Sequence, residues 1–275
     1  MPRPLIALAL LPALVALAPA VSGAPDALGP GDFLTVQKGT LPVVVSAPHG
    51  GRKKVPDVPE RAGTGLKNFQ TVRDENTAEL AERFAAELET LLKAKPWVVI
   101  ARFERKYLDV NRPAEQGYES EKAKPYYDAY HDALGAACKA VKEQHGRGLL
   151  LDIHGQGSFP GAICRGTQNL KSVKLLKERD GMPAVRGKNS VFGRLEQLGY
   201  KVLPAGDANE NAKEEPQFNG GHIVNHYGSH TAFAIDAIQV ELGSDFRTKG
   251  KYPTTAKDLA DAVRTFHDAY LKDEK

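Results

Sequence analysis

Seven short apolar runs predict β-strands, and amphipathic segments between them predict helices. The strand-like runs are Phe33–Gln37, Pro42–Ala47, Trp97–Phe103, Leu149–Ile153, Gly161–Cys164, Lys201–Leu203 and Ile235–Leu242. Several contain consecutive apolar residues, a pattern typical of strands that are buried on both faces. Because helical segments separate these strands, the pattern predicts an α/β fold: a mixed, mostly parallel sheet between helices, in three layers.

Helical periodicity is clearest over Asn76–Ala94, where apolar residues recur every three to four positions. These residues are Leu80, Phe84, Leu88 and Leu91. Asn76 followed by Glu79 resembles a capping box, which would start the helix. Three further segments have helical periodicity: Lys124–Gln144, Ser190–Leu198 and Thr255–Lys272.

The N-terminal residues 1–24 have the pattern of a secretory signal peptide. Arg3 supplies a positive charge, Leu5 to Leu17 is mostly apolar, and small residues offer a cleavage site. The apolar run is too short for a typical transmembrane helix, and no later segment matches it. We therefore predict an exported protein, periplasmic or extracellular, without a membrane anchor after cleavage. No linker divides residues 25–275, which predicts a single catalytic domain.

Charge and cysteine content narrow the possible functions. The net charge is only +3, and the basic clusters are short and lack interleaved aromatic residues, which argues against nucleic-acid binding. Cys138 and Cys164 could pair in an oxidising compartment, or both could be small buried apolar residues.

Two histidines directly follow apolar strands and precede glycines. His154 lies in Asp152-Ile153-His154-Gly155, and His49 is followed by Gly50-Gly51. Open α/β sheets place their ligand sites at the carboxyl ends of strands, so both histidines predict a site assembled by the fold around a metal. Asp152 could accept a hydrogen bond from a ligating His154. The alternatives are a loop histidine bound to backbone and an Asp–His pair that supports the core.

Carboxylates at two further positions could complete this site. Asp74 lies just before the predicted helix at residue 76, where it could bind a metal or interact with the helix dipole. Glu75 is the rival for the same role. Glu241 ends a core strand, where a carboxylate is costly unless it is paired or used. It could be a general base or part of a buried ion pair.

Two polar segments suggest substrate contacts. Asn111-Arg112-Pro113 offers a guanidinium and an amide for an anionic substrate, although a surface loop with internal ion pairs is the alternative. Pro204–Tyr227 is long and polar, and could act as a lid.

Within this segment, His222 and His226 have a spacing that would suit zinc on a helix, but the nearby glycines argue against a helix. We expect His131 to face solvent.

Several motifs in order resemble the N-formylglutamate amidohydrolase (N-formylglutamate deformylase) family, from about residue 42 to 245. They are Ser46-Ala47-Pro48-His49-Gly50-Gly51, Asp74 with Asn76-Thr77, Arg105 with Asp109-x-Asn111-Arg112-Pro113, Asp152-x-His154, Arg165-Gly166-Thr167 and Gln239-x-Glu241. The resemblance implies a zinc carboxypeptidase-like fold. It also implies zinc ligands His49, Asp74 (or Glu75) and His154, a general base Glu241, and Asn111 and Arg112 as ligands of the substrate carboxylate, helped by Arg105 and Arg165. The chemistry of amide hydrolysis further calls for an arginine that offsets the charge of the oxyanion, and we assign this catalytic role to Arg105.

These features favour an exported zinc-dependent hydrolase that cleaves an amide bond in a carboxylate-bearing substrate, such as an N-acyl amino acid. One alternative is carboxypeptidase-like hydrolysis of γ-glutamyl or cell-wall peptides, which export would suit. A non-enzymatic alternative is a carboxylate-binding module with the same fold. The expected partner is accordingly a small molecule or a short peptide.

Overall fold

The structure is a computed structural model that describes Met1, residues 29–207 and residues 212–272. Apart from Met1, the predicted signal peptide lies outside the described residues, so cleavage and export stay predictions. Among the helices of the described part, none is both long enough and apolar enough to cross a membrane.

A seven-stranded sheet forms the centre of the molecule, in the order β1-β3-β2-β4-β7-β5-β6. The strands are β1 (Leu34–Gln37), β2 (Val43–Ala47), β3 (Trp97–Ala101), β4 (Leu149–Gln156), β5 (Ala162–Gly166), β6 (Lys201–Leu203) and β7 (Asp236–Gly243). Strands β3, β2, β4 and β7 are parallel neighbours, whereas β1 and β5 join them antiparallel. The mixed, mostly parallel sheet predicted from the sequence is thus confirmed.

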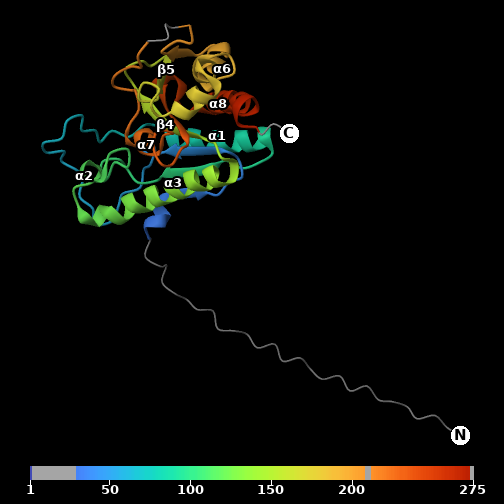
Figure 1. Cartoon of the computed structure of the whole chain (residues 1–275). Coiled ribbons are helices and arrows are strands. Elements are labelled where there is room, and N and C mark those ends of the chain that lie inside the picture. The colour runs from blue at the N-terminus through green and yellow to red at the C-terminus, as the bar shows by residue number, and fades with distance from the viewer. Residues whose placement is uncertain (2–28, 208–211, 273–275) are drawn as a thin grey trace.

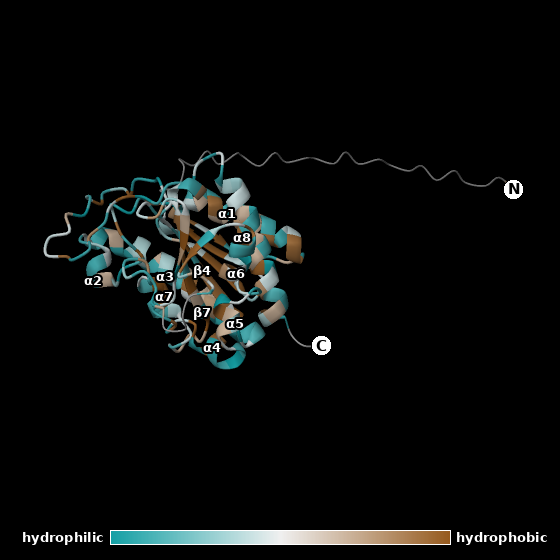
Figure 2. Cartoon of the chain, turned by 90° about the horizontal axis from the view of Figure 1, so that it is seen from above, coloured by the Kyte–Doolittle hydropathy of each residue, from teal (hydrophilic) through white to brown (hydrophobic). Residues whose placement is uncertain are grey.

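Helices cover both faces of this sheet (Figures 1 and 2). One face packs against α1 (Thr77–Leu92), α4 (Lys174–Asp180), α5 (Met182–Arg186), α6 (Val191–Gln197) and α8 (Tyr252–Phe266). The other packs against α3 (Lys124–His145) and α7 (His222–Tyr227). Shorter helical turns are α2 (Ala114–Gly117), η1 (Pro30–Phe33), η2 (Glu121–Ala123), η3 (Ser244–Phe246) and the π-turn η4 (His267–Leu271). In Figure 2 the brown, hydrophobic strands lie between these helices.

Helix α1 forms as its apolar periodicity predicts, but its start differs from the prediction. Leu80, Phe84 and Leu88 are fully buried against the sheet. The side chain of Asn76 does not cap the helix, and its backbone is left-handed, with φ of 60°. Its Nδ2 instead donates to the carbonyl of Arg247 at 2.7 Å. The capping-box prediction was therefore wrong, because a tertiary contact takes the Asn76 amide.

Strand alternation separates the core from the polar groups of β4. Leu149, Leu151 and Ile153 belong to the core beneath α1 and α8. Asp152 and His154 share the opposite face with Leu150, which packs toward α3. The parallel register sets His154 beside Glu241 of β7. Two predicted site residues are therefore placed side by side by the sheet itself.

Both cysteines are free and buried, Cys138 in α3 and Cys164 in β5. The disulfide considered from the sequence does not form, and the alternative of two small buried residues holds. Burial raises the pKa of both thiols, that of Cys164 to about 12, so both stay protonated and unreactive at neutral pH.

Truncating Phe84 to alanine should lower the free energy of unfolding by about 3–5 kcal/mol, because a fully buried ring is removed from the core of α1. Urea denaturation followed by circular dichroism measures the change. Leu91→Ala on the same helix is the control: its side chain is 42% exposed, and the loss should stay below about 1 kcal/mol. Equal losses in the two variants would contradict this packing.

Candidate active site

A cavity of about 1010 Å³ lies at the carboxyl ends of the central strands. Its lining includes His49, Asp74, His154 and Glu241, as well as Arg105, Asn111 and Arg112. Residues 216–221, from the segment predicted as a lid, form part of its wall. The volume is at the upper end of the range of small-molecule pockets. Most of the residues that the sequence singled out therefore meet in one cavity.

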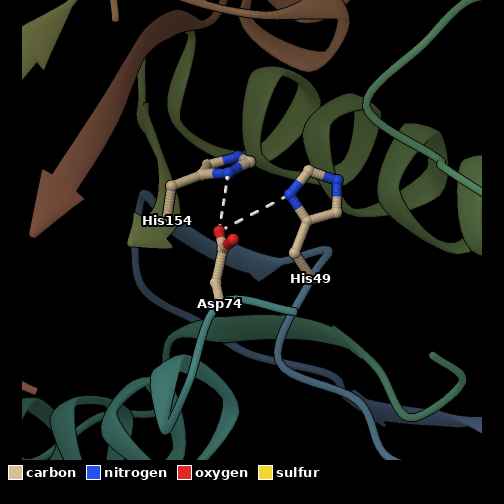
Figure 3. A group of neighbouring side chains, drawn as sticks. All are labelled: His49, Asp74 and His154. Carbon is tan, nitrogen blue, oxygen red and sulfur yellow. Dashed lines mark ion pairs between the residues drawn. The ribbon is translucent and has the colours of Figure 1, made fainter. Parts of the chain in front are cut away.

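His49, Asp74 and His154 form a compact, buried group in this cavity (Figure 3). One ligand atom from each lies within 4.8 Å of the others. The distance from Asp74 Oδ2 is 3.5 Å to Nδ1 of His49 and 3.4 Å to Nδ1 of His154. The buried Nδ1 of His49 has no hydrogen-bond partner. An orphaned imidazole nitrogen facing a carboxylate and a second imidazole fits a metal ion.

Two outer carboxylates orient the imidazole rings. Nε2 of His49 lies 2.7 Å from Oδ1 of Asp109, and Nε2 of His154 lies 2.8 Å from Oδ2 of Asp152. In each ring the Nε2–H donates to the carboxylate, which leaves the lone pair on Nδ1, the atom that faces Asp74. A carboxylate behind a histidine is the usual arrangement around ligating histidines. The hydrogen bond that the sequence suggested for Asp152 is present.

The two outer carboxylates are themselves fixed in place. Ser46 Oγ donates to Asp152 at 2.5 Å, and Arg105 Nε donates to Asp109 at 2.8 Å. Although burial opposes it, the interactions with His49 and Arg105 hold the pKa of Asp109 well below its usual value. Arg105 thus neutralises an outer carboxylate while it also lines the cavity.

The inner part of the site favours positive charge. Burial alone would raise the pKa of Asp74, but its interactions with His154 and His49 lower it, so this carboxylate stays ionised. Burial alone would lower the pKa of His154, but Asp152 and Asp74 raise it. Without a cation, the group attracts a proton. A metal ion would replace that proton and satisfy the same carboxylates.

Glu241 is buried beside this group. Its Oε1 accepts a hydrogen bond from Gln239 Nε2 at 2.7 Å. Burial, reinforced by the negative charge of Asp74, raises the pKa of Glu241 to about 7, although His154 opposes the rise. A carboxylate with a pKa near neutrality in a ligand cavity is suited to proton transfer.

Asp74 and Glu75, the two carboxylates considered for the third position, lie in different surroundings. Asp74 is buried, and its Oδ2 also accepts a hydrogen bond from the backbone N–H of Gly155 at 3.0 Å. The side chain of Glu75 is 60% exposed and pairs with Arg52 and Arg73. Only Asp74 belongs to the buried group.

Arg112 and Asn111 have different surroundings. The Arg112 guanidinium donates to the carbonyls of Asn111 and Asn68, at 2.9 and 3.4 Å. Within the described residues it forms no salt bridge, so no carboxylate in contact compensates its charge. Asn111 is buried: its Oδ1 accepts from the backbone N–H of Ile223 at 2.8 Å, and its Nδ2 donates to Gln239 at 3.4 Å. Asn111 therefore joins α7 to β7.

Arg165 lies outside the cavity. In the antiparallel register of β5 and β7, Cys164 is paired with Glu241 and Arg165 with Val240, so Arg165 points to the opposite face of the sheet. There it is buried, with Nε 3.3 Å from Oε1 of Glu214. The sequence analysis placed Arg165 near the site because of the order of the motifs along the chain. That order does not reveal to which face of the sheet a side chain points.

Arg247 is a cavity residue that the sequence analysis missed. Its buried guanidinium donates to the carbonyls of Glu75, Gln156 and Leu242, at 2.7, 3.1 and 2.9 Å. These carbonyls belong to the segments that bear Asp74, His154 and Glu241. A Cβ on Gly155 would lie 2.4 Å from the guanidinium carbon, which explains the glycine after His154. No local pattern indicates contacts to backbone carbonyls from three distant segments.

Three further histidines, His131, His222 and His226, also depart from expectation. His222 and His226 lie in α7, so the doubt about a helix there was wrong. His131 does not face solvent: burial and the neighbouring His222 and His226 lower its pKa to about 3. The glycines at 220 and 221 precede the helix instead of interrupting it, because α7 begins at His222.

Comparison with known proteins supports the family resemblance. The model of the family described as N-formylglutamate amidohydrolase matches residues 118–246, just under half of the chain. This match confirms the resemblance that the motifs indicated, and it supports hydrolysis of an amide bond. No curated protein matches the chain.

Two solved structures share the fold. An N-formylglutamate amidohydrolase from Ralstonia eutropha JMP134 aligns with a TM-score of 0.58 at 17% identity, over 86% of this chain and 97% of that one. A gene product of Agrobacterium tumefaciens aligns with a TM-score of 0.58 at 13% identity, over 87% and 95% of the two chains. At these identities the likeness concerns the fold, which is the one that the family resemblance implied.

Replacing Arg165 by glutamine should destabilise the protein by about 3 kcal/mol, because the buried Glu214 loses its cation. The surface variant Arg264→Gln should cost less than about 1 kcal/mol. Urea denaturation measures both. Because Arg165 lies outside the cavity, the KM of the folded variant should not change. A large rise in KM without destabilisation would restore Arg165 as a substrate ligand.

Proposed function

We propose, from the confirmed family resemblance, that this protein is an exported zinc-dependent hydrolase that cleaves an amide bond in a carboxylate-bearing substrate. The observation that supports this most is the buried His49–Asp74–His154 group, with both Nδ1 atoms facing one carboxylate oxygen and Glu241 in the same cavity.

His49, Asp74 and His154 would hold the zinc ion. Two imidazoles and one carboxylate are a common protein ligand set of catalytic zinc, and they leave a position for water or substrate. When bound, zinc supplies a Lewis acid that polarises the scissile carbonyl and lowers the pKa of water. Asp109 and Asp152 keep both Nδ1 atoms available for the ion.

Glu241 would act as the general base. Gln239 occupies Oε1, so Oε2 is the atom that accepts a proton from the attacking water and returns it to the leaving amine. In the metal-free site, burial keeps a proton on this carboxyl up to about neutral pH. A nearby dication lowers that pKa, which makes the carboxylate form available.

The cations of the cavity would bind and orient the substrate. Arg112 has no salt bridge within the described part of the chain, so its guanidinium can take the free carboxylate of the substrate in two parallel hydrogen bonds. Arg105, which lines the same cavity, would offset the negative charge that develops on the carbonyl oxygen. Asn111 holds the cavity wall in place and offers its amide to the same carboxylate.

The size of the cavity favours a second candidate: hydrolysis of γ-glutamyl or cell-wall peptides. About 1010 Å³ is enough for drug-sized ligands, more than a single acylated amino acid requires. Assays on N-formylglutamate, other N-acyl amino acids and short γ-glutamyl peptides would separate the two. A lower KM for the peptides would favour the larger substrate.

Glu241→Gln should reduce kcat by about 10²–10⁴-fold on the best substrate of that panel, because the general base is lost. Zinc content should stay at the wild-type level, since Glu241 is not a proposed ligand. Glu75→Gln is the matched control: its carboxylate is exposed, and kcat should change less than about twofold. Wild-type turnover in Glu241→Gln would refute the assigned base.

The wild-type protein should contain about one tightly bound zinc ion at the site of His49, Asp74 and His154, and His154→Ala should lose it. Asp109→Asn should weaken the affinity for this ion by about 10–100-fold, because His49 loses the carboxylate that orients its ring. Elemental analysis and competition with a chromophoric chelator measure content and affinity.

Asp261→Asn, which disrupts only ion pairs near the surface, is the control and should leave zinc affinity unchanged. Zinc binding that survives in His154→Ala with wild-type affinity, while Asp109→Asn also has no effect, would disprove this metal site.

A further inference from the structure

Arg247 is a buried arginine of the cavity for which the proposed hydrolysis has no use. It directly follows the short helix η3, after the end of β7. Its backbone N–H donates to the carbonyl of Ser244 at 3.2 Å, and its own carbonyl accepts from Nδ2 of Asn76 at 2.7 Å. The backbone of Arg247 is therefore held by its own turn and by the residue before α1, which leaves the side chain a defined place to reach from.

We propose that Arg247 is a positioning residue of the active site. Its guanidinium holds the loop that carries Asp74 against the ends of β4 and β7, and so fixes Asp74 relative to His154 and Glu241. The proposal rests on the proposed function for the roles of these three residues. It goes beyond that function because it assigns to Arg247 the separation between a zinc ligand and the general base.

The geometry of the guanidinium suits this role. A guanidinium is planar and carries its N–H donors in a rigid fork. Its Nε, Nη1 and Nη2 donate to the carbonyls of Leu242, Glu75 and Gln156, at 2.9, 2.7 and 3.1 Å. Each carbonyl belongs to a residue one or two positions after a proposed site residue, namely Glu241, Asp74 or His154. All three bonds form together only when the three segments keep fixed separations.

Gly155 gives the guanidinium its space and also binds Asp74. A Cβ at residue 155 would lie 2.4 Å from the guanidinium carbon and 2.5 Å from Nε of Arg247. The backbone N–H of the same glycine donates to Oδ2 of Asp74 at 3.0 Å. This Oδ2 is the oxygen that faces Nδ1 of His49 and of His154. The guanidinium thus packs against the residue that fixes the oxygen proposed to bind zinc.

The charge of Arg247 is available to the site. Its three acceptors are neutral carbonyls, and no carboxylate of the described residues forms a salt bridge with it. Burial lowers the pKa of Arg247, and the negative charges of Asp74 and Glu241 oppose the decrease, so the side chain stays cationic at neutral pH. Arg247 therefore places a positive charge near both carboxylates without occupying their oxygens.

The first test measures amide hydrogen exchange in the full-length protein after metal is removed with a chelator. Arg247→Lys keeps the charge, but one ammonium group cannot replace the fork, so exchange at Gly155 should increase as its bond to Asp74 loosens. Arg194→Lys is the matched control, because Arg194 lies outside the cavity and pairs with Asp261. It should leave exchange at Gly155 unchanged. Wild-type exchange at Gly155 in Arg247→Lys would overturn the proposal.

The second test measures zinc affinity and kinetics of the same variants. Arg247→Lys should weaken zinc binding by about 10–100-fold and reduce kcat by about 100-fold, because Asp74 and Glu241 lose their alignment. KM should change less than about threefold, since Arg112 keeps its surroundings. A raised KM with wild-type kcat and zinc affinity would overturn the positioning role. Failure of the proposed function is seen separately, as absence of zinc from the wild-type protein, and the exchange result obtained without metal still decides the role of Arg247.

Gly155→Ala tests the same contact from the other side. Its methyl group would displace the guanidinium, so this variant should lose zinc affinity as Arg247→Lys does. In the Arg247→Ala background the methyl group has room, and adding Gly155→Ala should change zinc affinity by less than about twofold. Additive losses would contradict the proposal, because the glycine would then act independently of the guanidinium. If Arg247→Ala does not fold, Arg247→Lys and Gly155→Ala still provide the comparison.

Discussion

Four carboxylates are buried around two imidazoles at one end of the sheet, and their charge must be compensated there. Asp74 lies between His49 and His154, Asp109 and Asp152 lie behind those rings, and Glu241 lies beside them. Buried carboxylates are costly unless cations or hydrogen bonds satisfy them. Arg105 and the imidazoles supply part of the compensation, and a metal ion would supply the rest. The ionisation, orientation and reactivity of the site all depend on this balance.

The sheet makes such a concentration of charge possible. Because β2, β4 and β7 run parallel, their carboxyl ends open at the same edge, where His49, His154 and Glu241 follow or end a strand. Arg247 then joins β4 and β7 to the segment before α1 through the carbonyls of Gln156, Leu242 and Glu75. Its cationic charge acts on Asp74 and Glu241. The site residues therefore lie on strand ends and on a loop that hydrogen bonds join to one another.

Sequence patterns were sufficient where the relevant contact is local or periodic. The apolar runs predicted all seven strands, and the hydrogen bond between Asp152 and His154 that the Asp-x-His motif suggested is present. They failed where the partner is distant. The amide of Asn76 binds the Arg247 carbonyl instead of capping α1, and Arg165 binds Glu214 on the far face of the sheet. In each case a residue separated by many positions decides the outcome.

By itself, the sequence determined the strands, the main helices and the polar residues at strand ends, because hydrophobic burial imposes periods of 2 and 3.6 on the chain. It did not determine which polar residues meet. Strand register and helix packing place Asp74, and not Glu75, between the two histidines. They also keep Arg165 outside the cavity and bring His131 into contact with α7. Only the tertiary structure sets these distances, because electrostatic and hydrogen-bond contacts depend on separation in space, whereas local patterns reflect separation along the chain.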